Sequence, residues 1–186
     1  MNLENKDYLE KLKYPIGQWK KIVNLTDSDR KNYIQNIANF PKNLQLALSN
    51  ISKDALSWKY RPEGWTIKQV VHHCADSHIN AFIRTKLALT ESQPTISTYE
   101  EQIWAQLIDS QDDDLSFSIK IIEGIHHKWV QILNNLVEND YQKTYFHPGT
   151  KTIYCLNDMI MLYSWHCNHH LAHIAQAFQY KGKFNF

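Results

Sequence analysis

Apolar residues recur at helical spacing in four separate stretches of the chain, which cover residues 27–51, 66–89, 115–136 and 156–180. Each stretch places its apolar side chains three or four residues apart, so that they fall on one face of a helix. The first stretch contains Pro41, a residue that favours a bend within a helix. The pattern predicts four amphipathic helices of about 20 residues or more.

A polar connection that contains Pro94 joins the second and third stretches. Between Asn139 and Tyr154, aromatic and β-branched residues flank a Pro-Gly turn, a pattern that predicts a short β-hairpin. Three aspartates at 112–114 precede the third helix, where negative charge suits the positive end of the helix dipole. The chain has only five glycines and five prolines, which disfavours a turn-rich β architecture. We therefore expect an all-α fold: one domain over residues 1–186, a four-helix bundle with a short β-hairpin before the last helix.

The amino-acid composition limits the kinds of molecule that the protein is expected to bind. Twenty lysines and arginines oppose 19 aspartates and glutamates, so the net charge of +1 gives no general attraction to nucleic acid or an anionic membrane. The three cysteines, Cys74, Cys155 and Cys167, match neither a disulfide framework nor a CxxC motif. We find no signal peptide and no apolar run long enough to cross a bilayer. These features predict a soluble cytoplasmic protein that acts on a small molecule.

Histidines are concentrated in the fourth predicted helix, in the segment WHCNHHLAHI. His166 and His170 are four residues apart and share one helix face, and His169 and His173 share another. Either spacing presents two imidazoles to one ion, so spacing alone does not choose between the pairs. Burial favours the first pair, because it continues an apolar stripe made of Met159, Tyr163, Cys167, Ile174 and Ala177.

The second predicted helix offers a third ligand in the segment VHHCADSH, from His72, His73 or His78. The third helix holds a reserve pair, His126 and His127. A single histidine on a helix is usually hydrogen-bonded or exposed and binds no metal. Seven histidines in two short helical segments favour a shared cation, because several buried imidazoles would otherwise each need another partner.

The sequence resembles the DinB-like helical bundles, and within them the YfiT-like metal-dependent hydrolases and bacillithiol transferases. The resemblance spans nearly the whole chain and rests on YPIG at 14–17, GWTIKQVVHHCADSHINAFIRTKLALTE at 64–91, HHKW at 126–129, FHP at 146–148 and WHCNHHLAHI at 165–174. It implies a divalent ion bound by His73, His166 and His170. Relatives often have three consecutive histidines where this chain has Asn168, His169 and His170, and that difference spares the implied ligand.

Three neutral imidazoles would leave the ion its full charge and one open coordination position. The resemblance thus implies one divalent ion per subunit, zinc first and nickel second, in a metal-dependent hydrolase. One alternative is a transferase that attacks electrophiles with a low-molecular-weight thiol of the bacillithiol kind, and another is a non-catalytic bundle stapled by metal. Asp76, three residues after His73, is a candidate base or a carboxylate that orients an imidazole. The oligomeric state stays open, with a homodimer as one candidate.

Overall fold

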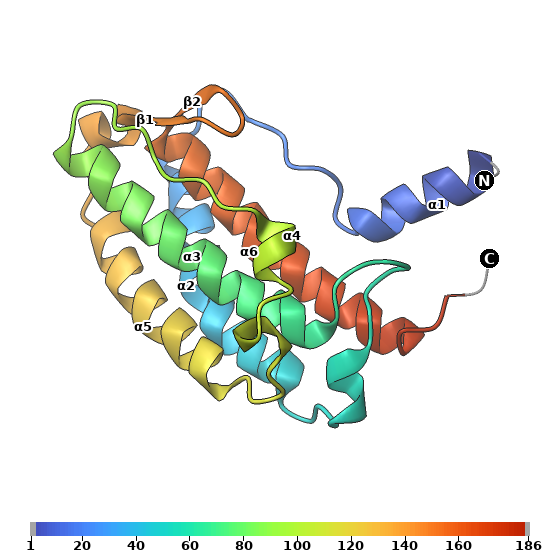
Figure 1. Ribbon diagram of the computed structural model, residues 1–186. Helices are drawn as coiled ribbons and strands as arrows, with labels where there is room; N and C mark the ends of the chain where they lie inside the picture. The colour runs from blue at the N-terminus through green and yellow to red at the C-terminus, as the bar shows by residue number, and fades with distance from the viewer. Residues whose placement is uncertain (1–2, 185–186) are drawn as a thin grey trace.

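Four long helices dominate the computed structural model, which describes residues 3–184 (Figure 1). They are α2 (Asp27–Leu48), α3 (Ile67–Thr90), α5 (Ser116–Leu133) and α6 (Leu156–Tyr180). The predicted four-helix bundle is confirmed, and the predicted helix ends agree with the observed ends within three residues. Helix α2 continues through Pro41 without interruption, although the proline favours a bend.

Shorter elements connect the long helices. They are α1 (Leu3–Lys13), η1 (Asp54–Ser57), α4 (Glu101–Trp104), η2 (Asp109–Gln111), η3 (Glu138–Gln142), β1 (Thr144–His147) and β2 (Thr152–Cys155). The two strands pair antiparallel, with Thr144 opposite Cys155 and His147 opposite Thr152. This confirms the predicted hairpin before the last helix.

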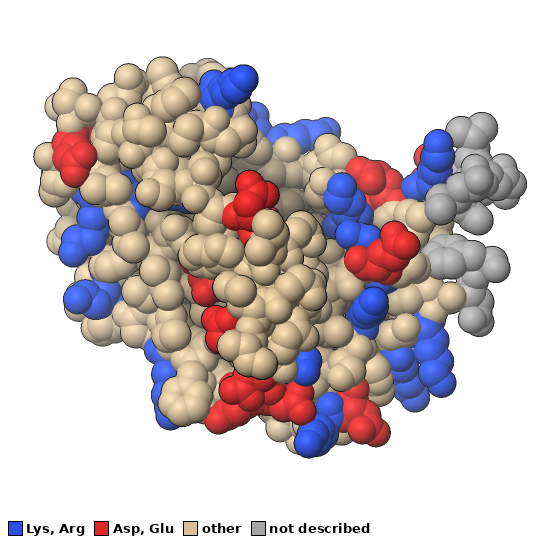
Figure 2. Space-filling view, in the orientation of Figure 1, with Lys and Arg blue, Asp and Glu red and all other residues tan. Residues whose placement is uncertain are grey.

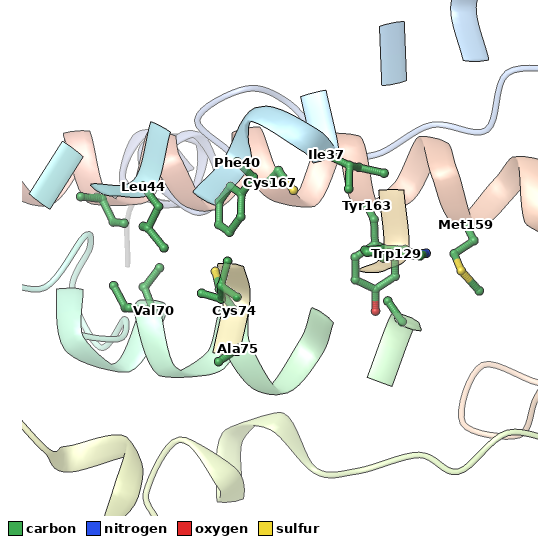
Figure 3. Close-up of a cluster of buried hydrophobic side chains, with 14 of the residues drawn as sticks. Ile37, Phe40, Leu44, Val70, Cys74, Ala75, Trp129, Met159, Tyr163 and Cys167 are labelled. Atoms are coloured by element: carbon green, nitrogen blue, oxygen red, sulfur yellow. The ribbon is translucent and has the colours of Figure 1, made fainter. Parts of the chain in front are cut away.

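The order in which the long helices pack determines where the histidines meet. Helix α2 lies against α5 and α6, and α3 also lies against α5 and α6. The two histidine-rich helices, α3 and α6, are therefore direct neighbours. Figure 3 shows the apolar interior between the helices, with Phe40 and Leu44 of α2 facing Val70 and Cys74 of α3.

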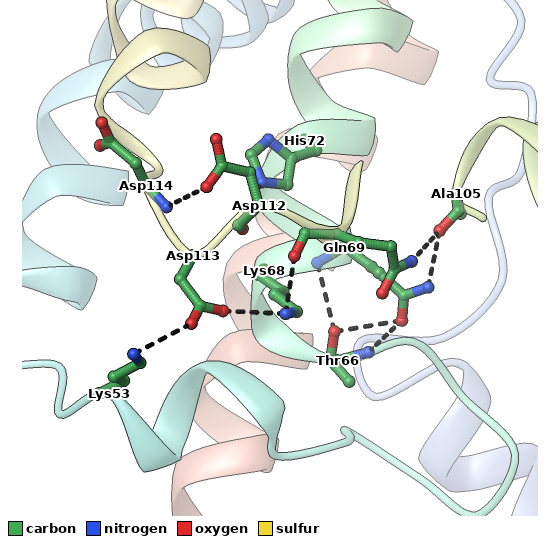
Figure 4. Close-up of polar contacts among 10 residues, drawn as sticks. Lys53, Thr66, Lys68, Gln69, His72, Ala105, Asp112, Asp113 and Asp114 are labelled. Carbon is green, nitrogen blue, oxygen red and sulfur yellow. Dashed lines mark hydrogen bonds and ion pairs between the residues drawn. The ribbon is translucent and has the colours of Figure 1, made fainter. Parts of the chain in front are cut away.

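A capping box fixes the start of α3 and thereby the position of every histidine on it. The Thr66 side chain accepts a hydrogen bond from the backbone N–H of Gln69, and the Gln69 side chain accepts one from the backbone N–H of Thr66 (Figure 4). Gln69 also donates to the carbonyl of Ala105 at 2.7 Å, which attaches the connection between α4 and η2 to the helix.

The aspartate run lies in the loop just before α5. Asp114 accepts a hydrogen bond from the backbone N–H of Ser116 at 2.9 Å, at the amino end of the helix. Asp113 pairs with Lys68 at 2.9 Å and with Lys53 at 3.8 Å (Figure 4). The aspartates of this run therefore bind the amino end of α5 and nearby lysines.

The surface carries both signs of charge. Figure 2 shows lysines and arginines interspersed with aspartates and glutamates on this face of the molecule, as the small net charge leads one to expect. Within residues 3–184, no helix has the length and apolar character needed to cross a bilayer.

Candidate metal site

Three histidines from the neighbouring helices α3 and α6 converge inside the bundle. His73 lies on α3, and His166 and His170 lie one turn apart on α6. The Nε2 atom of His166 lies 3.3 Å from Nε2 of His73 and 3.2 Å from Nε2 of His170. One ligand atom from each ring lies within 4.8 Å of the other two, and no other trio of histidine, cysteine or carboxylate side chains in the described chain does so. The structure thus brings together the three residues that the sequence resemblance selects.

Both members of the other histidine pair of α6, His169 and His173, are buried, whereas His166 of the first pair is only partly buried. His169 is 7% exposed and His173 is 2% exposed, compared with 5% for His170. The burial argument for choosing between the pairs is therefore wrong. The second pair is buried because residues outside α6 cover it. The Tyr60 ring stacks on His173 at 3.7 Å between centroids, and the Tyr14 ring lies 5.9 Å from His169. The two pairs differ instead in which partners their ring nitrogens face.

The N-terminal segment, defined here as residues 12–21, supplies part of this coverage. The backbone carbonyl of Lys13 lies 3.0 Å from Nε2 of His173. Three more contacts join the segment to α6: Gln176 Nε2 to the Leu12 carbonyl at 2.8 Å, Trp165 Nε1 to the Gly17 carbonyl at 3.0 Å, and Lys21 Nζ to the Asp158 carboxylate at 2.8 Å. The segment is thereby attached along the side of α6 that carries His173.

The carbonyl of Lys13 determines which nitrogens of His173 and His170 carry hydrogen. A carbonyl oxygen only accepts, so Nε2 of His173 donates to Lys13, and in a neutral ring Nδ1 is then the acceptor. Nδ1 of His170 lies 3.4 Å from that acceptor and is the donor. The hydrogen of His170 is consequently on Nδ1, and its Nε2 lone pair faces the other two histidines of the site.

The same reasoning assigns His166 from the opposite side. Nδ1 of His126 donates to the carbonyl of Ile37 at 2.7 Å, so Nε2 of His126 accepts from Nδ1 of His78 at 2.7 Å. Nε2 of His78 then accepts from Nδ1 of His166 at 3.0 Å. His166 therefore also presents an Nε2 lone pair to the site.

Burial keeps these rings neutral, as the assignment requires. Desolvation lowers the pKa of His126 from its ordinary 6.5 to about 4 and that of His173 to about 3. Desolvation, with neighbouring histidines as the secondary cause, lowers the pKa of His78, His166 and His170 well below the ordinary value. At neutral pH each ring thus carries one N–H.

These tautomers make the site a good fit for a cation. The Nε2 atoms of His166 and His170 lie 3.2 Å apart with a lone pair on each, so no hydrogen bond joins them. Nitrogen ligands about 2.1 Å from a tetrahedral zinc ion lie about 3.4 Å apart, close to the observed separations. His73 supplies a third nitrogen at 3.3 Å, and burial lowers the pKa of His73 to about 4. The donor set therefore suits one divalent ion.

The other histidines that the sequence offered as ligands, on α3 and α5, have partners outside the three converging rings. His72 contacts the Ser118 hydroxyl at 2.8 Å and the Asp112 carbonyl at 3.1 Å, away from the three converging rings. In the reserve pair, His126 lies behind His166, separated from it by His78, and His127 is exposed.

Asp76 does not hydrogen-bond to any of the three converging histidines through its carboxylate among the described contacts. The positions behind His166 and His170 are occupied by His78 and His173, so the expected orienting carboxylate is replaced there by imidazoles. Desolvation, followed by repulsion from Asp109, raises the pKa of the Asp76 carboxyl to about 6.

Sequence reasoning missed two hydroxyl groups beside the site. The Ser77 hydroxyl lies 3.5 Å from Nε2 of His166 and 3.4 Å from the Tyr163 hydroxyl. The Tyr163 hydroxyl also donates to the Ser77 carbonyl at 3.2 Å. The available signal was spacing, because Ser77 follows His73 by four residues and so lies on the same helix face.

Comparison with known proteins identifies relatives across most of the chain. The family model described as the DinB superfamily matches residues 37–174. "Putative metal-dependent hydrolase YfiT" of Bacillus subtilis is 39% identical over 165 residues, which cover 89% of this chain and 93% of that protein. A Bacillus cereus protein also named as a putative metal-dependent hydrolase is 43% identical over 163 residues, 88% of this chain and 93% of its own length.

A solved structure agrees with the fold. The structure described as "YfiT from Bacillus subtilis is a probable metal-dependent hydrolase with an unusual four-helix bundle topology" matches with a TM-score of 0.89 and 37% identity. The match covers 94% of this chain and 99% of that one.

Proposed function

Because this chain belongs to the DinB superfamily, we propose that it is a metal-dependent hydrolase in which His73, His166 and His170 bind one divalent ion. The observation that carries the proposal is the 3.2 Å separation of the Nε2 atoms of His166 and His170, neither of which carries hydrogen in the tautomers assigned above. Relatives named as metal-dependent hydrolases over about nine-tenths of the chain support the same class of activity.

The number of ligands favours catalysis over a purely structural ion. Structural zinc sites are normally closed by four protein ligands, whereas catalytic sites keep three and an open position. Among the described residues, the group contains three nitrogen donors and no cysteine or carboxylate. Imidazole binds both zinc and nickel, and we propose zinc with nickel as the alternative. When bound, the ion would act as a Lewis acid and lower the pKa of a group at its open position.

The protein groups around the ion have separate roles in this proposal. Trp65, at 4.6 Å between ring centroids from His73, covers one ligand, and its indole N–H is held by Gln102 at 3.1 Å. Asp76 is the proposed general base because it follows His73 by three residues, on the same side of α3, and desolvation raises the pKa of its carboxyl to about 6. The Ser77 hydroxyl, 3.5 Å from Nε2 of His166, is proposed to orient the substrate.

Thiol transfer is the second candidate reaction. The three proposed ligands are all neutral, so the ion would keep its double charge and favour an anionic thiolate at the open position. A low-molecular-weight thiol would then be a substrate. Hydrolysis and transfer use the same ion and differ in the nucleophile.

An activity screen with purified, zinc-loaded protein tests the proposal. Ester and amide substrates are assayed without thiol, and an electrophile is assayed with and without a low-molecular-weight thiol. Ester or amide cleavage that is lost in His170→Ala and kept in the exposed His127→Ala supports the hydrolase. Acceleration only in the presence of thiol would replace hydrolysis by transfer, and bound metal without either activity would favour a structural ion.

The state of the cysteines bears on the cellular compartment in which the protein acts. We propose a cytoplasmic enzyme for a small-molecule substrate, since the three cysteines form no disulfide and two of them are buried. Size-exclusion chromatography with light scattering tests whether the chain forms a homodimer.

A further inference from the structure

Two buried histidines beyond the proposed ligands form a continuous chain of hydrogen bonds behind His166. The chain runs from the Ile37 carbonyl to His126 at 2.7 Å, from His126 to His78 at 2.7 Å, and from His78 to His166 at 3.0 Å. These residues come from three helices, α2, α5 and α3, before the chain reaches α6. His78 is 0% exposed and His126 is 1% exposed, so water does not compete for these contacts.

We propose that His78 and His126 are positioning residues that hold His166 in the Nδ1–H tautomer, so that its Nε2 lone pair is available to the ion. The inference rests on the proposed metal site. The fixed end of the chain is the Ile37 carbonyl, which accepts and cannot donate. Each histidine passes this constraint to the next, because a neutral ring that donates from one nitrogen accepts at the other.

The alternative tautomer of His166 is disfavoured at both ends of the ring. Its Nδ1 lone pair would face the Nε2 lone pair of His78 at 3.0 Å, and its Nε2–H would occupy the space between the three ligand nitrogens. Reversing the whole chain would leave Nδ1 of His126 without a hydrogen opposite the Ile37 carbonyl. A buried acceptor facing another acceptor loses its hydrogen bond without gaining one from water.

Aromatic packing holds the planes of the two positioning rings. The Phe40 ring lies 5.0 Å from His78 and 5.4 Å from His126 between centroids. Trp129 lies 6.4 Å from His78, and its N–H donates to the Thr85 hydroxyl at 2.9 Å. The rings therefore have little freedom to rotate away from the chain of hydrogen bonds.

The partner behind His166 also affects the ion electronically. Metal-binding histidines often donate to a carboxylate, which increases the basicity of the ligand. Here the acceptor is a neutral imidazole, so His166 gives less negative charge to the ion. The arrangement leaves the ion more electrophilic at the expense of some affinity.

Metal affinity in variants tests the proposal. Zinc dissociation constants are measured by competition with a chromophoric chelator, and His78→Leu should weaken binding about 10–100-fold. His126→Leu leaves the contact between His78 and His166 in place and should weaken binding less. His78→Gln offers a carbonyl acceptor to His166 and should recover most of the affinity. The matched control is His72→Leu, which removes a buried, hydrogen-bonded histidine of α3 that faces away from the three ligands.

Histidine ¹⁵N NMR of the metal-free protein tests the tautomer without relying on metal. His166 should show hydrogen on Nδ1 in the wild type and a mixture of both tautomers in His126→Leu. A wild-type spectrum with hydrogen on Nε2, or equal zinc affinity in folded His78→Leu and wild type, would overturn the inference. If His78→Leu fails to fold, as judged by circular dichroism, the affinity and spectrum of His126→Leu decide the question.

The two proposals can fail separately. Wild-type protein that binds neither zinc nor nickel would refute the metal site, whatever the tautomer of His166. Tight binding that is equally strong in the wild type and in folded His78 and His126 variants would keep the metal site and refute the positioning role.

Discussion

Lowering the pH should destabilise the metal-free protein well before ordinary carboxylates titrate, because several neutral histidines are buried. Burial lowers the pKa of His73 and His126 to about 4 and that of His173 to about 3 in the folded protein. In the unfolded chain these side chains return to a pKa of about 6.5. As the pH falls, the unfolded chain therefore takes up protons first, and folding becomes less favourable.

The loss in the free energy of unfolding follows from the difference between the pKa in the folded protein and the pKa in the unfolded chain. The stabilisation from neutral burial is fully present above about pH 6.5 and declines by about 1.4 kcal/mol per pH unit for each histidine, until the folded-state pKa is reached. At about pH 5 each of the three histidines has lost about 2 kcal/mol, or roughly 6 kcal/mol together. The total free energy of unfolding of a domain is about 5–15 kcal/mol, so we expect the metal-free protein to be marginal or unfolded there.

Urea denaturation in the presence of a chelator, followed by circular dichroism at a series of pH values, measures this effect. The free energy of unfolding should fall steeply between about pH 6.5 and 5. His126→Gln should reduce the slope by one histidine's share, whereas the exposed His127→Gln should leave it unchanged. A free energy of unfolding that stays constant, or rises, over this interval would refute the argument.

Three further predictions concern the metal and the helix start. Elemental analysis should find most bound metal lost in His170→Ala and little lost in His169→Ala, and full occupancy in the His170 variant would exclude His170 as a ligand. Chelation should lower the melting temperature, since an ion at a thousandfold excess over its dissociation constant stabilises the folded protein by about 4 kcal/mol. The helical circular dichroism signal should persist, because the apolar core does not depend on metal. Loss of the helical signal would instead indicate a structural ion. Thr66→Ala removes half of the capping box of α3 and should cost about 1 kcal/mol in urea denaturation, and an unchanged midpoint would contradict this role for Thr66.

The long helices could be predicted because their apolar period repeats over many turns. Helix α6 was predicted from residue 156 to residue 180, as observed, and the predicted end of α2 differs from the observed end by three residues. The short helices α1 and α4 were not predicted. Helix α4 has only four residues, too few for a periodic signal, and α1 is polar over most of its length.

The site could be predicted only in part. Spacing indicated pairs of histidines on α6 but left His166 with His170 and His169 with His173 as equal candidates, and the family resemblance made the choice. Burial failed as a criterion because the N-terminal segment covers His173, a contact 160 residues distant in sequence. The chain behind His166 depends on contacts 48, 88 and 89 residues apart, for which local periodicity carries no signal.

Because the N-terminal segment is attached beside His173, a change within residues 12–21 affects the proposed metal site. The Lys13 carbonyl orients His173, and through it the His170 ring, so detaching the segment removes the acceptor that fixes that ring. Thermodynamic linkage is reciprocal, so an ion that binds better when the segment is attached also holds the segment in place by the same factor. Protease cleavage within residues 12–21 should consequently slow when the ion is bound, so that the cleavage rate measures how fully the proposed site is occupied.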